Sequence, residues 1–117
     1  MTNGEAFQIL TVLASVNETG RLGYAIAKQR RMIETELKEF IDIRNAAITA
    51  HMDGDTMTED GAAAANAEIA EYIDLPCEFR VVTVPEDVFV SGTLTSDQMY
   101  ILDFMVEDSK DERKEIP

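Results

Sequence analysis

The stretch from Gly23 to about His51 contains no proline and no internal glycine, and it is the feature that most constrains the fold. Apolar residues recur along it at about 100° per residue, which places them on one face of a helix. They are Ile26, Ile33, Leu37, Phe40, Ala47 and Ile48. We therefore expect one long amphipathic helix as the spine of the fold.

Three further segments have helical patterns. Thr2 and Glu5 form a capping-box pattern before an apolar run, which predicts a helix over about 4–16. An alanine-rich segment begins at 62 and ends before Pro76, and it is expected to form the second arm of an antiparallel helical hairpin with the spine. A second capping box, Thr95 with Gln98, predicts a C-terminal helix over about 96–107.

The segment from Cys77 to Val84 is rich in β-branched and aromatic residues and predicts a strand. Residues 88–90 fit either a short returning strand or a single turn of helix. The predicted fold class is therefore α+β, mainly helical. A chain of 117 residues has room for one core, so we expect a single domain over 1–108, followed by a charged, flexible tail over 109–117.

The net charge of −13 is concentrated in the middle of the chain, because residues 45–109 hold 14 Asp and Glu against one base, Arg80. A surface of one sign repels nucleic acid, phosphorylated ligands and anionic membranes, so the sequence favours a protein partner with a basic surface. Solubility is the simpler interpretation of the same charge. The candidate partner-binding residues are Asp53, Asp55, Glu59, Asp60, Glu68, Glu71 and Asp74.

Arg44 is unusual because it falls in the middle of the apolar face of the spine. Its guanidinium group must reach water, pair with an acid of a neighbouring element or subunit, or bind an anionic ligand. Arg30 lies near the same face, and Tyr24 precedes it by six residues. Structural pairing, or a side chain that extends along the helix to reach water, is the favoured interpretation, and a ligand pocket between subunits that uses Arg44, Arg30 and Tyr24 is the alternative.

No pattern of catalytic residues is found. The sequence has no glycine-rich phosphate loop and no nucleophile elbow, and its single histidine, His51, has no obvious partner. Asp53 and Asp55 resemble the start of a calcium loop, but the later ligand positions hold unsuitable residues, which favours a solvated linker. We therefore expect no enzyme activity, no cofactor and no metal.

No apolar stretch approaches the ~20 residues that cross a bilayer. The N-terminus has no secretory pattern, and the single Cys77 cannot form an internal disulfide. These features predict a protein of the cytoplasm.

The chain resembles a family of small bacteriophage and prophage proteins known as a domain of unknown function. The resemblance rests on residues 2–5, on residues 102–108, and on residues 23–28 followed by Glu34, residues 36–38, Phe40 and Arg44. The centre differs, since family members have a loop rich in Lys, Gly and Asn after the long helix. The resemblance implies a phage origin and a place in the bacterial host cytoplasm or the virion, and it carries no catalytic residues.

Three functions follow as expectations. The first is a non-enzymatic phage accessory protein that binds another protein or self-associates as a homo-oligomer. The second is an inhibitor of a host defence or nucleic-acid enzyme, in which the acidic segment mimics a phosphate backbone. The third is an oligomeric sponge for a small anionic ligand.

Overall fold

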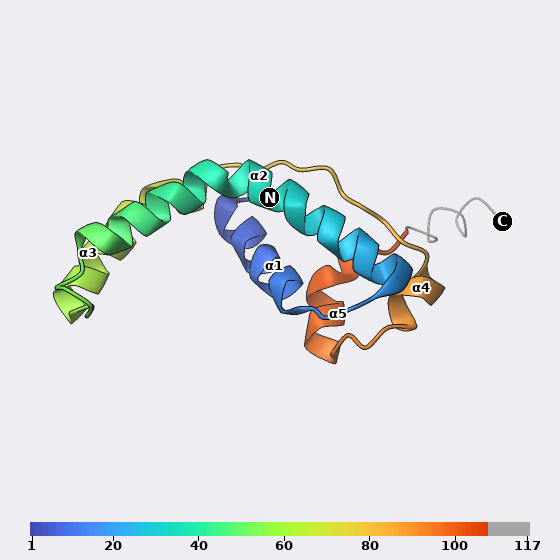
Figure 1. The fold of residues 1–117 in the computed structure, drawn as a ribbon. Coiled ribbons are helices and arrows are strands. Elements are labelled where there is room, and N and C mark those ends of the chain that lie inside the picture. The colour runs from blue at the N-terminus through green and yellow to red at the C-terminus, as the bar shows by residue number, and fades with distance from the viewer. Residues whose placement is uncertain (108–117) are drawn as a thin grey trace. The chain divides into compact units, whose positions relative to one another are not determined.

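A computed structural model of the chain describes residues 1–107, and within them the fold is mainly helical, as predicted (Figure 1). The helices are α1 (Asn3–Ser15), α2 (Gly20–Ala50), α3 (Glu59–Ile73), α4 (Glu86–Val90) and α5 (Ser96–Leu102), followed by the 3₁₀ turn η1 (Asp103–Met105). The tail predicted over 109–117 lies outside the described residues. No helix within 1–107 combines the length and the apolar character needed to cross a membrane.

The chain divides into two compact units. The first unit comprises residues 1–8 and 33–79, and the second comprises 9–32 and, in its described part, 80–107. Helices α1 and α2 therefore contribute residues to both units. The single domain expected from the sequence stays a prediction.

In the first unit, the N-terminus is fixed against the end of α3. The main-chain N–H of Asn3 donates to the carbonyl of Leu75 at 2.9 Å, and the N–H of Cys77 donates to the carbonyl of Met1 at 2.8 Å. The side-chain amide of Asn3 also donates to the carbonyl of Tyr72 at 2.9 Å. These bonds join the first turn of α1 to the segment that follows α3.

A tight turn separates α2 from α3. Asp53 and Thr56 exchange main-chain hydrogen bonds across it, and Gly54 has a φ of +63°, which favours glycine. The hydroxyl of Thr58 then caps α3 by accepting from the N–H of Gly61. A Cβ atom on Gly61 would lie 2.2 Å from the carbonyl oxygen of His51, so glycine lets α3 start close to the end of α2.

The buried apolar side chains of the first unit come from α1, α2, α3 and the segment after α3. They are Ala6, Ile33, Leu37, Phe40, Ala47, Ala65 and Cys77. Burial of these side chains is the main favourable term for folding the unit.

The strand predicted from Cys77 to Val84 is wrong, since no ladder forms there in the described part of the chain. In the second unit, the side chain of Gln29 replaces a neighbouring strand. Its Nε2 donates to the carbonyl of Arg80 at 3.0 Å, and its Oε1 accepts from the N–H of Val82 at 2.7 Å. The carbonyl of Arg80 and the N–H of Val82 are thus satisfied without a sheet. Of the two alternatives for residues 88–90, the structure shows helix, as α4.

The rest of the second unit is held by capping and by one isolated bridge. The capping box of Thr95 and Gln98 forms as predicted, but α5 ends at Leu102, five residues before the predicted end, and η1 follows. Val84 pairs with Val106 in a parallel bridge. The buried apolar side chains of this unit are Ile9, Leu13, Leu22, Ala25, Ile26, Val84, Phe89, Leu94, Leu102 and Met105.

Candidate functional site

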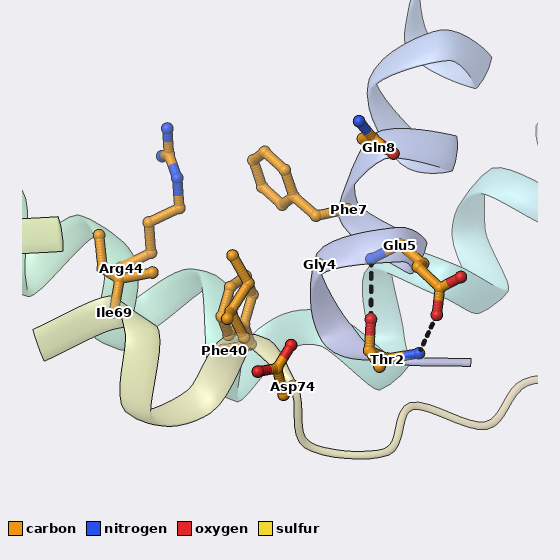
Figure 2. Close-up of a pocket in the computed structure, with 10 residues that line it drawn as sticks. Thr2, Gly4, Glu5, Phe7, Gln8, Phe40, Arg44, Ile69 and Asp74 are labelled. Carbon is orange, nitrogen blue, oxygen red and sulfur yellow. Dashed lines mark hydrogen bonds between the residues drawn. The ribbon is translucent and has the colours of Figure 1, made fainter. Parts of the chain in front are cut away.

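A cavity of about 420 Å³ lies in the first unit (Figure 2). Its walls come from the start of α1, the second half of α2, and α3 with its C-cap. The lining residues are Thr2, Gly4, Glu5, Phe7, Gln8, Phe40, Arg44, Ile69, Ile73 and Asp74. This volume falls within the ~300–1,000 Å³ of ordinary binding pockets.

The capping box of α1 shapes one wall of the cavity. The N–H of Thr2 donates to Oε1 of Glu5 at 3.0 Å, and the N–H of Glu5 donates to Oγ1 of Thr2 at 3.2 Å. The hydrogen bonds from Thr2, first from its main chain and then from its side chain, lower the pKa of Glu5. A Cβ on Gly4 would lie 2.8 Å from Cγ1 of Ile73, so glycine allows α1 to lie against the end of α3.

Arg44 lies over an aromatic pair at the cavity. Its guanidinium carbon is 4.9 Å from the centroid of the Phe7 ring. The Phe7 ring meets the Phe40 ring edge to face, with centroids 6.1 Å apart and an interplanar angle of 70°. Arg44 also donates from Nη1 to Oδ1 of Asn45 at 3.3 Å, and no carboxylate in residues 1–107 lies within ion-pair distance of it.

The charge on the apolar face is therefore accommodated by an aromatic ring and a neighbouring amide. This cation–π arrangement leaves Arg44 half-buried in the cavity lining. Pairing with an acid, one of the solutions expected from the sequence, is not what the described residues show. Figure 2 shows Arg44 on one side of the Phe7 side chain and Glu5 on the other.

The lining of the cavity is mainly apolar, with a few polar and charged side chains. The lining residues include no His, Cys or Lys, and the two carboxylates, Glu5 and Asp74, accompany mainly apolar walls. Such a cavity can receive an apolar side chain, while its polar margin contacts charged or main-chain groups.

All seven acids predicted to bind a partner are exposed, and all belong to the first unit. Glu68 accepts a hydrogen bond from Nε2 of His51 at 2.7 Å. The other six have no basic side chain within ion-pair distance in the described chain; they are Asp53, Asp55, Glu59, Asp60, Glu71 and Asp74. The structure brings Asp74 to the cavity and leaves the acids of the turn before α3 away from it.

The two units differ strongly in net charge. The first unit holds thirteen Asp and Glu against two bases, Lys38 and Arg44. The second unit holds six acids against five bases in its described part. Almost the entire net charge therefore belongs to the unit that contains the cavity.

Of the three predicted ligand-binding residues, only Arg44 lines the cavity of the first unit, and the pocket between subunits that would use all three stays a prediction. Tyr24 and Arg30 belong to the second unit, where Tyr24 is 70% exposed, and neither lines the cavity that contains Arg44. Asp53 and Asp55 lie on the tight turn, and residues 1–107 contain no group of three His, Cys, Asp or Glu side chains placed to hold a metal ion.

The structural roles of two residues, Phe7 and Gln29, were not predicted from the sequence. Phe7 belongs to the apolar run that follows the capping box of Thr2 and Glu5, and nothing in its spacing indicates that it contacts Arg44. Gln29 is completely buried. It lies three residues after Ile26 and four before Ile33, and this spacing on the apolar face is the feature of the sequence that indicates its burial.

No family model, no curated protein and no solved structure matches the chain. The resemblance to small phage proteins accordingly stays a prediction from the sequence.

Proposed function

We propose that the protein is a non-catalytic phage or prophage accessory protein that acts by binding another protein through its first unit. The partner surface is basic, and the site of action is the bacterial host cytoplasm or the virion. The observation that carries the proposal is the concentration of charge in the first unit, thirteen acids against two bases.

Three features of the structure support binding as the activity. Six exposed carboxylates of the predicted set have no cationic partner in residues 1–107, so they are free to pair with an incoming basic surface. The cavity offers apolar walls beside one of these acids, Asp74. The contact of His51 with Glu68 is consistent with α2 and α3 pairing as an antiparallel helical hairpin that presents the acids, which forms part of the proposal.

A mimic of the phosphate backbone is the second candidate. It is favoured by the same unpaired carboxylates, since a row of fixed negative charges can occupy a basic nucleic-acid channel. The two candidates differ in the kind of partner, a structural or regulatory protein in the first and a nucleic-acid enzyme in the second.

Affinity capture from the bacterial host tests the proposal with three baits. The first is the natural chain, and the second carries Glu59→Gln, Asp60→Asn and Glu71→Gln. The third is a matched control in the second unit, with Glu86→Gln, Asp87→Asn and Asp97→Asn. Both altered sets remove three exposed charges, most of them from first turns of helices.

We expect a captured protein that is retained by the natural chain and by the control and is lost from the second bait. Its binding should weaken as salt rises toward about 1 M, where the Debye length is ~3 Å. A captured nuclease or other nucleic-acid enzyme would favour the mimic. Equal capture by all three baits, or indifference to salt, would contradict the proposal.

A further inference from the structure

We infer that the cavity of the first unit is the docking site for a basic, amphipathic helical segment of the partner protein. This inference rests on the proposed function and specifies how the partner binds. The apolar side chains of the segment enter the cavity, and its lysine and arginine side chains contact the surrounding carboxylates.

The apolar part of the argument is the composition of the walls. Phe7, Phe40 and Ile69 line the cavity from three helices (Figure 2). Ile73 of α3 also lines it. Ile73 is 38% exposed, so part of its apolar surface is in contact with water. The cavity therefore leaves apolar surface in water that a partner could cover.

The charge around the cavity selects the kind of occupant. Glu5 and Asp74 line it, Glu71 lies one turn before Asp74 on α3, and residues 45–79 contain no Lys or Arg. A second copy of the chain that docked through its own first unit would bring acids against acids, and an acidic or phosphorylated ligand would meet the same repulsion. An occupant that is both apolar and basic complements both features.

A helix is the form of segment that presents the two properties together. Apolar residues at a spacing of three and four fill a groove while basic residues flank them, which is the usual arrangement of a helix bound in a groove. Arg44 is compatible with this occupant because Phe7 already faces its charge. Its remaining N–H groups suit the main-chain carbonyls at the C-terminal end of a bound helix, where the partial charge is negative.

The chain has no tryptophan, which makes a direct experiment available. A synthetic peptide of leucine and lysine at helical spacing, with one tryptophan on its leucine face, is titrated with the full chain. A peptide of the same composition in scrambled order is the control. We expect saturable binding of the amphipathic peptide with a blue shift of the tryptophan emission, and about tenfold weaker binding of the scrambled one.

Two variants place the peptide in the cavity. Ile73→Asn removes apolar wall and should weaken binding about tenfold. Gln8→Lys adds a positive charge at an exposed lining position and should weaken it severalfold without affecting the fold. Matched controls in the second unit, Tyr100→Ser and Thr83→Lys, change exposed residues and should leave binding unchanged.

The outcomes separate this inference from the proposed function. Salt-sensitive binding of both peptides alike, with no blue shift and no effect of either cavity variant, would overturn the docking site and leave a basic partner in place. Binding of neither peptide at low salt would overturn both. Equal weakening by the cavity variants and their controls would also overturn the docking site.

Discussion

The guanidinium carbon of Arg44 lies 4.9 Å from the centre of the Phe7 ring, so the charge on the spine of the fold rests on an aromatic face supplied by α1. Phe7 in turn contacts Phe40, which belongs to α2 like Arg44. The three side chains connect α1 to α2 within the first unit and line its cavity.

A double-mutant cycle measures this contact. We expect Arg44→Met and Phe7→Leu to be coupled by about 0.5–1 kcal/mol in the free energy of unfolding, because a partly exposed cation–π pair has that strength. Urea unfolding of the two single variants and the double variant gives the coupling. Arg44→Met combined with Tyr72→Leu is the control, since no hydrogen bond or cation–π contact joins those two side chains in residues 1–107, and its effects should add. Equal coupling in both cycles would refute a specific Arg44–Phe7 interaction.

Gln29 should be the polar residue whose loss destabilises the second unit most. Replacement with the similarly sized Met removes both hydrogen bonds to the main chain of Arg80 and Val82. We expect a loss of about 2–4 kcal/mol in the free energy of unfolding, since two hydrogen bonds vanish and their partners stay partly buried. Faster hydrogen exchange at the N–H of Val82 should accompany it. Gln8→Met at an exposed position is the control and should change stability little.

The helices could be predicted because their signals are local. The capping boxes at Thr2 and Thr95 fix where α1 and α5 begin without any tertiary contact. The segment without proline predicts the long helix, although α2 begins at Gly20, three residues before the expected start at Gly23. The prediction of a strand from Cys77 to Val84 was wrong because a strand needs a neighbouring strand. Here the side chain of Gln29 bonds to the carbonyl of Arg80 and the N–H of Val82 instead.

The candidate site was only partly predictable for the same reason. The position of Arg44 on the apolar face follows from helical spacing, and the acidity of the region follows from composition. Its contact with Phe7 depends on how α1 meets α2, and no periodicity within one helix contains that information. The cavity likewise depends on three helices that are distant in the sequence.

Cys77 should report the opening of the first unit. It is buried, and burial together with the nearby charge of Glu36 raises the pKa of its thiol above the usual 9.0. Less thiolate is then present at any pH up to about 9, and reagents have little access to it. We expect alkylation of the folded protein to be at least about tenfold slower than alkylation in urea.

A relocated thiol provides the control for that measurement. Cys77→Ser combined with Thr83→Cys places the only thiol at an exposed position of the second unit. This variant should react at similar rates with and without urea. Fast reaction of Cys77 in the folded protein would contradict its burial.

The α1 capping box should make stability depend on pH. The pKa of Glu5 is lowered in the folded protein from 4.5, so its contribution is complete above the unfolded pKa and is lost as pH falls through the folded value. Glu5→Gln should therefore be less stable than the natural chain at pH 7, and the difference should shrink below about pH 4. Urea midpoints across pH measure it. Glu39→Gln removes the same charge from an exposed position on α2 and controls for net charge; the same pH profile for both variants would exclude a role of the cap.

Two glutamates of α3 should respond to neutralisation in opposite directions. Glu71 is exposed and unpaired in a strongly acidic unit, so Glu71→Gln relieves repulsion and should stabilise the protein by about 0.2–0.5 kcal/mol at low salt. Glu68 accepts the hydrogen bond of His51 at 2.7 Å, so Glu68→Gln should destabilise it by about 0.5–1 kcal/mol. Salt at about 1 M should abolish most of the first effect and less of the second, because screening weakens exposed repulsion more than a direct hydrogen bond. Urea unfolding at both salt concentrations measures the two effects. Stabilisation by both substitutions would mean that the His51–Glu68 hydrogen bond contributes less to stability than the repulsion that Glu68 adds.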